Sequence, residues 1–484
     1  MSRRITGAFN RVEGDLEVRI EVEGDRVRDA WVISPLFRGF EQMLEGKAPE
    51  DALVYVPRIC GICSVSQSVA AARALAAAQG IEPTTNGHLA ANLILACENL
   101  ADHLTHFYLF FMPDFARPEA YDGLPWFEEI AARFRAQTGS AAREVLPARA
   151  AFLHLTGILA GKWPHTLAIQ PGGTTVAVDA ARIARLRMIL HGFRDFLERT
   201  VFGDCLEAVA EIDSEAALWA WVEEGEGDFR RFLRLAGALK LEGLGRAQDR
   251  FMSFGVYPDE DGETLFPAGI ATATGGREPL DTAAIREDLS HAWLRGGEAP
   301  RHPRQGVTRP HAPDDGPAYT WCKAPRLAGE PMEVGALARQ QVAGHPLIRD
   351  LVRRSGGNVR NRVIARLLEI ARVVPEMEGW LAALRPGEPF CRHGRTPEAG
   401  EGEGLAEAAR GSLGHWLQVR DGRIANYQII APTTWNFSPR DAEGRPGPLE
   451  QALIGAPVRP GEREPVAVQH IVRSFDPCMV CTVH

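Results

Sequence analysis

Residues 58–67 read RICGICSVSQ and residues 474–484 read SFDPCMVCTVH, so a C-x-x-C pair lies towards each end of the chain. The pairs are Cys60 with Cys63 and Cys478 with Cys481. A single pair is a weak signal, because zinc sites and thiol–disulfide sites share it. Two pairs can supply four thiolates if the fold brings them together. Since structural zinc sites are usually assembled from local sequence, pairs this far apart favour a metal buried inside a fold that closes around it.

The spacing leaves the identity of the metal open. It favours a structural zinc ion bound by all four cysteines, and a thioredoxin-like redox site is the second interpretation. Thiolates also suit nickel, copper(I) and iron–sulfur clusters. Cys63 would begin a helix, whose dipole favours the thiolate form. The other cysteines are isolated and are interpreted as buried free thiols: Cys97, Cys205, Cys322 and Cys391.

The composition is that of a globular chain. It has 484 residues, of which 45% are hydrophobic and 24% charged, and a formal net charge of −9. The negative charge and the lack of a basic stripe argue against nucleic-acid binding. No apolar stretch follows MSRRITG, so we expect no secretory signal and a cytoplasmic location. Charged residues interrupt the most apolar run, residues 88–115, which predicts a buried amphipathic helix and no membrane span.

The apolar patterns predict an α+β fold that is mainly helical. Alternation within about residues 5–34 indicates a β-hairpin, and a second hairpin turns at RDGR between residues 415 and 430. Helical spacing covers residues 65–80, 178–202 and 361–374. Segments rich in proline, glycine and charge at about 296–316 and 391–404 are predicted to be surface loops. With no internal repeat or long linker, we expect one intertwined domain over residues 1–484.

The chain as a whole resembles the large subunit of nickel–iron hydrogenases. RICGIC and DPCMVCTVH are similar to the first and last cysteine motifs of that family. Further blocks resemble the family in the same order: NRVEGDLEVRIEV, LFRGFE, HFYLFFMPD, YTWCKAPR, ARGSLGHW and NYQIIAPTTWN. The resemblance implies the [NiFe]-hydrogenase large-subunit fold, with long central helices and small peripheral sheets. It also implies heterolytic cleavage of H2, with electrons passed to Fe–S clusters on a small subunit.

The family resemblance implies a role for each cysteine. Cys60 and Cys478 would be terminal nickel ligands. Cys63 and Cys481 would bridge nickel to an iron that carries two cyanides and one carbon monoxide. No Fe–S motif occurs in this chain, so those clusters are expected only in the partner subunit.

Four further residues would act beside the metals. Glu13 matches the family's first proton acceptor, beyond the thiolate of Cys478. Arg410 matches the arginine that stands over the open metal position. Asp114 and Asp476 match the carboxylates that hold this arginine.

Two more groups of residues complete the implied site. Pro432 and Thr433 match residues that line the diatomic ligands of iron. Glu41, His484 and the backbone carbonyl of Ile429 match the ligands of a buried magnesium ion. Magnesium prefers octahedral oxygen coordination, so a histidine ligand follows here from the resemblance alone.

Three departures from the usual family pattern point to its hydrogen-sensing, regulatory branch. Gln67 stands where a histidine is usual, near the expected contact with the partner's closest cluster, and an amide cannot carry charge. Ile62 and Phe110 replace smaller residues at the inner end of the family's gas channel, which they would narrow. Ala409 replaces a proline before Arg410. The sequence also stops after His484, where most precursors in the family continue, as we expect for the sensing branch.

The sensing branch implies slow turnover and a regulatory partner such as a sensor histidine kinase. An energy-conserving uptake hydrogenase with the same chemistry is the first alternative. A non-catalytic relative, such as the quinone-site subunit of respiratory complex I, is expected to lack the metal cysteines. A structural four-cysteine zinc protein remains the third alternative.

Overall fold

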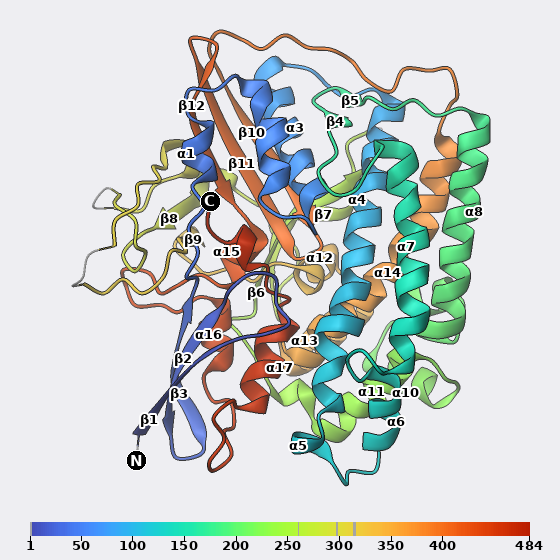
Figure 1. Cartoon of the computed structure of the whole chain (residues 1–484), viewed down its shortest axis with the longest axis vertical. Coiled ribbons are helices and arrows are strands. Elements are labelled where there is room, and N and C mark those ends of the chain that lie inside the picture. Colours follow the sequence, from blue (N-terminus) through green and yellow to red (C-terminus); the bar gives the residue numbers. More distant parts are fainter. Residues whose placement is uncertain (1, 260, 297–298, 313–315) are drawn as a thin grey trace.

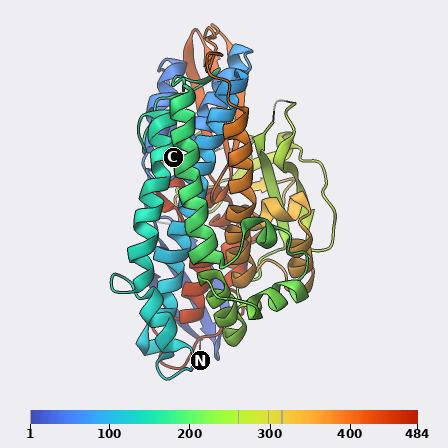
Figure 2. The same ribbon diagram turned by 90° about the vertical axis from the view of Figure 1, so that its right-hand side faces the viewer.

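Four long helices lie side by side along one side of the molecule (Figures 1 and 2). The structure is a computed structural model that describes residues 2–259, 261–296, 299–312 and 316–484. The helices are α4 (Thr85–Thr105), α7 (Ser140–Ala160), α8 (Ala180–Phe196) and α14 (Val359–Ala383). α4 contacts α7 and α14, and α8 also contacts both α7 and α14. The predicted helices at 178–202 and 361–374 are therefore two members of one bundle, and the α+β class is confirmed.

The apolar run at residues 88–115 forms three consecutive helical segments. α4 ends at Thr105, and a π-helical turn (His106–Phe111) and a 3-10 turn (Met112–Ala116) follow it. α4 is buried on nearly all its faces, because it lies between α3, α7 and α14. Within the described part of the chain, no helix is both long enough and apolar enough to cross a membrane.

The alanine-rich helix α3 (Ser64–Gln79) packs against a three-stranded antiparallel sheet. Its strands are β10 (Gly400–Ala408), β11 (Gly411–Arg420) and β12 (Arg423–Ile430). The expected hairpin is β11–β12, but the predicted loop at 391–404 was wrong at its end, because residues 400–404 begin β10. Glycine serves here for close packing: a Cβ at Gly402 would lie 1.8 Å from the carbonyl oxygen of Ala74.

A second three-stranded sheet lies at the N-terminus (Figure 1). It consists of β1 (Ser2–Ala8), β2 (Glu17–Glu23) and β3 (Arg26–Ile33) in that order, all antiparallel. The alternating residues Val18, Ile20 and Val22 of β2 are buried. α16 (Pro448–Leu453) packs on β3, so the C-terminal part of the chain covers the N-terminal sheet.

Short strands and irregular segments occupy the region between α11 (Asp228–Leu239) and α12 (Ala336–Ala343). β6 (Arg250–Pro258) pairs with β7 (Thr264–Thr272), and β8 (Ile285–Asp288) pairs with β9 (Ala324–Leu327). In the expected loop at 296–316, the described residues form isolated bridges and one 3-10 turn, Pro303–Gln305. Residues 297–298 and 313–315 of that loop lie outside the described residues.

The two ends of the sequence meet inside the molecule. The N–H of Met479 donates to the carbonyl of Glu13 at 2.7 Å, and Glu13 and Cys478 form a parallel β-bridge. His484 is 4% exposed, and the C-terminus lies in the body of the molecule in Figure 1. The backbone of the N-terminal segment therefore fixes the C-terminal cysteine motif in place.

Candidate metal centre

The four cysteines of the two C-x-x-C pairs converge on one point. Their Sγ atoms all lie within 4.8 Å of one another and all four residues are buried. The Sγ–Sγ distances are 3.4 Å for Cys60 and Cys478, 3.0 Å for Cys63 and Cys481, and 3.0 Å for Cys478 and Cys481. In the part of the chain that the structure describes, this is the only group of three or more Cys, His, Asp or Glu residues with metal-site geometry.

Local structure positions each sulfur. Cys60 follows a 3-10 turn (Val56–Arg58), and Cys63 is the residue before the first turn of α3. Cys478 follows α17 (Val466–Ser474), and Cys481 ends the 3-10 turn Met479–Cys481. Each pair therefore sits at the start or end of short helical segments, and the four Sγ atoms converge.

The pKa values of the four thiols differ from the ordinary value of a cysteine. Hydrogen bonds from Cys478, and then from the other two thiols, lower the pKa of Cys60. A hydrogen bond with Cys478 together with burial raises the pKa of Cys63, and burial raises the pKa of Cys478 and of Cys481. Burial opposes ionisation of the thiols, and a cation among the four sulfurs would favour their thiolate forms. The four sulfurs fit a soft divalent metal.

Cys63 caps the N-terminus of α3, and a buried carboxylate shares that end of the helix. The expected effect of the helix dipole on Cys63 stays a prediction. The carboxylate of Glu98 accepts hydrogen bonds from the N–H groups of Val65 and Ser66 at 2.8 and 2.9 Å, and from the indole of Trp163 at 3.0 Å. Glu98 therefore occupies the positive end of the helix. Burial raises the pKa of Glu98 to about 7, against the effect of these donors.

Thr433 lies directly beside Cys478, one of the four converging cysteines. α15 (Pro432–Asn436) begins with Pro432, and the Thr433 hydroxyl oxygen accepts the N–H of Cys478 at 3.2 Å. Both residues are buried, and the contact fixes the backbone from which the Cys478 thiol projects. Their expected role toward the ligands of iron stays a prediction.

Glu13 is half-buried beside the same cysteine motif. Its backbone pairs with Cys478, as described above. Burial raises the pKa of Glu13, negative charge on Cys60 raises it further, and Arg410 opposes both effects. A carboxyl group whose pKa is raised in this way can take up a proton near the thiolates and release it again.

Two carboxylates hold Arg410, but one of them differs from our expectation. The guanidinium of Arg410 lies 2.7 Å from Asp102 and 3.0 Å from Asp476, and its Nε donates to the carbonyl of Asp476 at 2.9 Å. Burial raises the pKa of Asp102, partly offset by Arg410. Burial also opposes the ionisation of Asp476, but Arg410, His106 and Arg366 together lower the pKa of that carboxyl group. Asp102 was missed, although an acid one helical turn after Glu98 in an apolar helix marks an inward-facing charge.

Asp114 does not contact Arg410, so its predicted role was wrong. Its carboxylate accepts from Arg473 at 2.8 Å on both oxygens and from His470 at 3.2 Å, and it also pairs with Arg11. Burial opposes its ionisation, but His470, Arg473 and Arg11 together hold the pKa of Asp114 well below its usual range. The 3-10 turn that carries Asp114 faces α17, so this carboxylate ties helices together.

Glu41 and His484 lie in a second polar cluster. Glu41 is 1% exposed and accepts the N–H of Ile429 at 2.9 Å. The ammonium of Lys323, which sequence reasoning missed, lies 3.2 Å from both carboxylate oxygens of Glu41. The Nε2 of His484 is buried without a hydrogen-bond partner, and burial first, then nearby His415, keeps the pKa of His484 well below its usual value.

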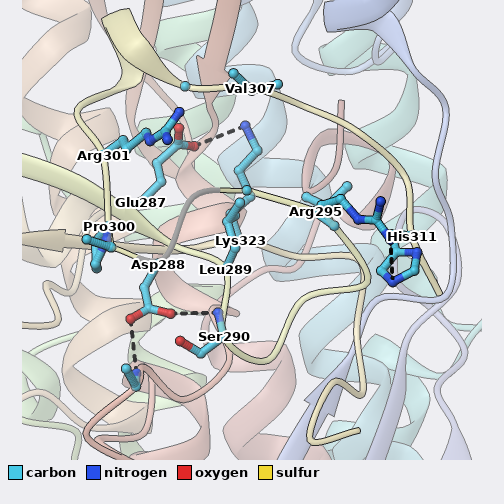
Figure 3. Close-up of a pocket in the computed structure, with 15 residues that line it drawn as sticks. Glu287, Asp288, Leu289, Ser290, Arg295, Pro300, Arg301, Val307, His311 and Lys323 are labelled. Atoms are coloured by element: carbon cyan, nitrogen blue, oxygen red, sulfur yellow. Dashed lines mark hydrogen bonds and ion pairs between the residues drawn. The ribbon is translucent and has the colours of Figure 1, made fainter. Parts of the chain in front are cut away.

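This cluster holds some of the donors that magnesium uses. Glu41 offers a carboxylate, which Lys323 contacts, and His484 offers a neutral imidazole nitrogen with no hydrogen-bond partner. Lys323 also pairs with Glu287 at 3.2 Å, at a cavity of about 290 Å³ (Figure 3). Burial raises the pKa of Glu287 to about 7, while Lys323 opposes this effect. The magnesium site stays a prediction.

Gln67 does not lie at a surface that a partner could reach. It is 1% exposed in the isolated chain, on α3, and its Oε1 accepts the Nε2–H of His415 at 2.8 Å. Nδ1 of His415 in turn accepts the hydroxyl of Tyr427 at 2.8 Å. Burial lowers the pKa of His415 to about 3, so its ring is neutral at physiological pH. β11 covers the Gln67 side chain, and its expected place near the partner's closest cluster stays a prediction.

The side chains of Ile62 and Phe110 are both half-buried. Ile62 packs against the main hydrophobic core between the first two cysteines. Phe110 lies in the π-helical turn, and its carbonyl accepts a hydrogen bond from Arg11 at 3.2 Å. Their expected place along a gas channel stays a prediction.

The comparisons with known proteins agree with this geometry. A family described as nickel-dependent hydrogenase matches residues 38–120 and 143–484. The periplasmic [NiFeSe] hydrogenase large subunit of Desulfomicrobium baculatum is 30% identical over 98% of this chain and 93% of its own length. The uptake hydrogenase large subunit of Azotobacter chroococcum is 29% identical over 100% and 95%. The crystal structure of H2-activated D. baculatum [NiFeSe]-hydrogenase superposes over 100% of both chains with a TM-score of 0.85 and 30% identity.

Proposed function

The chain belongs to the nickel-dependent hydrogenase family, as the catalytic large subunit of such an enzyme, and from this premise we propose that it binds a nickel–iron centre and reports the presence of hydrogen. The four buried sulfurs within 4.8 Å of one another carry this proposal. The centre, when bound, supplies the heterolytic cleavage of H2. Cys60 and Cys478 would hold nickel alone, while Cys63 and Cys481 would bridge it to iron.

The residues around the thiolates divide the remaining tasks. Glu13 takes the proton that leaves the Cys478 side of the centre, supported by its raised pKa and by the backbone bridge to Cys478. Arg410 places a fixed positive charge over the cluster, supported by its ion pairs with Asp102 and Asp476. Because two carboxylates hold this guanidinium, its position changes little during turnover.

The polar residues beside the cysteines would receive the non-protein ligands. Thr433 and Pro432 are proposed to line the carbon monoxide and the two cyanides on iron, with the threonine hydroxyl as a donor. Glu41, His484 and the carbonyl of Ile429 are proposed to bind magnesium. This is supported by the unpartnered Nε2 of His484.

The three departures from the usual family pattern, at Gln67, Ile62 and Phe110, support a regulatory, hydrogen-sensing role. Gln67 and the neutral ring of His415 form a hydrogen-bonded pair that carries no charge, beside α3 and the metal motif. Ile62 and Phe110 are bulkier than the residues usual at these family positions. The chain would work in the cytoplasm with an Fe–S small subunit and a sensor histidine kinase. An uptake hydrogenase is the second candidate, because the relatives named above include an uptake enzyme.

Two measurements on the anaerobically purified complex with its small subunit test the chemistry. Metal analysis should find nickel and iron, and infrared spectra should show bands of iron-bound carbon monoxide and cyanide. Zinc without nickel would overturn the proposed centre. The sensing role predicts slow H2 oxidation and loss of hydrogen-responsive transcription when the gene is deleted. Fast turnover together with unchanged transcription would instead assign the chain to the uptake class.

A further inference from the structure

Arg410 lies in an unusual turn. It and Ala409 form the two-residue connection between β10 and β11, where Ala408 pairs with Gly411. Two-residue hairpin turns favour positive φ at their central residues, since this matches the twist of the strands. Neither Ala409 nor Arg410 has a positive φ. The strands alone do not favour this turn, so contacts from elsewhere must hold it.

Arg339 of α12 makes those contacts. Its guanidinium is fully buried and donates to the carbonyls of Ala408 at 3.0 Å and of Ala409 at 3.2 Å. The remaining N–H groups donate to Glu369 at 2.7 Å, twice, and to Glu407 at 2.9 Å. All five donors of the guanidinium are thereby used, in the fork geometry that only arginine provides.

The same network reaches the residue that holds the other end of Arg410. Asp102 of α4 binds the guanidinium of Arg410 at 2.7 Å. Its neighbour His103 contacts Glu369 at 3.1 Å, and Glu369 binds Arg339. Two consecutive residues of α4 are therefore linked to the turn. Asp102 binds the Arg410 guanidinium, and His103 is linked through Glu369 and Arg339 to the carbonyls of Ala408 and Ala409.

The start of α12 also touches the turn without any intervening side chain. Gly411 has φ 127°, and a Cβ there would lie 2.5 Å from the backbone nitrogen of Gly335. Gly335 has φ 130°, and a Cβ there would lie 3.2 Å from the carbonyl oxygen of Arg410. α12 and the turn are thus in direct backbone contact, which transmits any displacement of Arg339 to Arg410.

We propose that Arg339 is a positioning residue for hydrogen cleavage: through the carbonyls of Ala408 and Ala409 it sets the place of the Arg410 guanidinium over the four sulfurs. This inference rests on the hydrogenase activity and does not depend on the sensing role. A lysine at position 339 keeps the charge between Glu369 and Glu407 but cannot bind two carboxylates and two carbonyls at once. Arg410 would then lose its defined position, while the negative charges of Glu369 and Glu407 would still be balanced by the lysine.

A double-mutant cycle in the heterodimer with its small subunit tests this role. Arg339→Lys should lower kcat for H2 oxidation and for H2/D2O exchange by about tenfold, as expected for a small displacement of a catalytic group. Nickel and iron content should equal the wild-type values. Arg339→Lys should cause less than about a twofold further loss in an Arg410→Lys background, because a positioning residue has nothing left to position.

A second buried arginine serves as a control for the general effect of replacing a buried guanidinium group with an ammonium group. Arg326 is 3% exposed, pairs with Asp441 at 3.0 Å and donates to the carbonyls of Pro439 and Arg445. Arg326→Lys should leave kcat unchanged. Equal losses from Arg339→Lys with and without Arg410 would overturn the proposal, as would unchanged kcat. If Arg339→Lys yields no heterodimer, Glu369→Gln replaces it in the same cycle, with the same two outcomes.

Discussion

Glu13 and Cys478 face each other in a parallel β-bridge although they lie near opposite ends of the sequence. The bridge places a carboxyl group with a raised pKa beside a cysteine that would bind nickel. One short stretch of backbone therefore fixes the place of the Glu13 carboxyl group relative to the cysteine motif.

Glu13→Gln should lower H2 oxidation by at least about 100-fold, because an amide cannot accept the proton that a general base removes. Nickel content and infrared bands should stay as in the wild type. In the wild type, the rate should rise with pH through the raised pKa of Glu13, since only the ionised form accepts a proton. Stopped assays from acidic to neutral pH measure this profile. A mutant rate close to that of the wild type would show that protons leave by another path.

Asp102→Asn and Asp114→Asn should separate catalysis from stability. Asp102→Asn removes one of the two carboxylates on Arg410 and should reduce kcat by about 10- to 100-fold, because it frees a positioned charge. Asp114→Asn leaves Arg473, Arg11 and His470 without their common anion, and should lower the free energy of unfolding by about 3–5 kcal/mol. Measurements of kcat and of the free energy of unfolding in denaturant compare the two variants. A loss of kcat in Asp114→Asn and a loss of stability in Asp102→Asn would instead place Asp114 in the active site.

Acid stability should depend on Asp114. Its pKa in the folded chain is below the unfolded value, so its contribution is complete above about pH 4 and is lost as the pH falls further. The wild type should therefore lose stability more steeply than Asp114→Asn below about pH 4. Thermal melts at a series of acidic pH values compare the two slopes. Parallel slopes would mean that other carboxylates dominate acid unfolding.

Gln67→Ala should destabilise the large subunit without weakening its binding to the small subunit. The mutation removes the acceptor of the His415 Nε2–H in a buried place, which costs about 1–3 kcal/mol. Denaturant melts measure the loss, and co-purification of the two subunits measures the assembly. Impaired assembly with unchanged stability would return Gln67 to the subunit interface.

Cys481→Ser should remove most of the nickel, because the serine hydroxyl stays protonated where a thiolate is needed. Cys97→Ser is the matched control. Cys97 is also fully buried but does not belong to the group of four converging cysteines. Elemental analysis of both variants compares their nickel content. Equal loss in both would indicate a general folding defect.

Periodicity and ordered motifs were enough to predict the helical class and to bring the two cysteine pairs together. The errors arose where tertiary contacts decide. Asp102 and Asp114 both lie in the run 88–115, and only the path of the backbone after Thr105 shows which carboxylate reaches Arg410. The sequence also does not reveal that β11 covers Gln67.

Glycine misled the secondary-structure prediction in a related way. Gly402 and Gly404 suggest a loop by composition, but they allow β10 to lie against the backbone of α3. Lys323 was missed because an isolated lysine in a motif carries no signal of burial. Its partners Glu41 and Glu287 come from distant segments and become visible only in three dimensions.

The meeting of the two chain ends has a consequence for biosynthesis. The two cysteine pairs lie more than 400 residues apart in the sequence, so Cys478 and Cys481 are synthesised long after Cys60 and Cys63. At about 5–20 residues per second, the first pair waits tens of seconds for the second. The four-sulfur site can therefore be completed only once Cys481 has been synthesised, and any chain that terminates before Cys481 lacks a ligand.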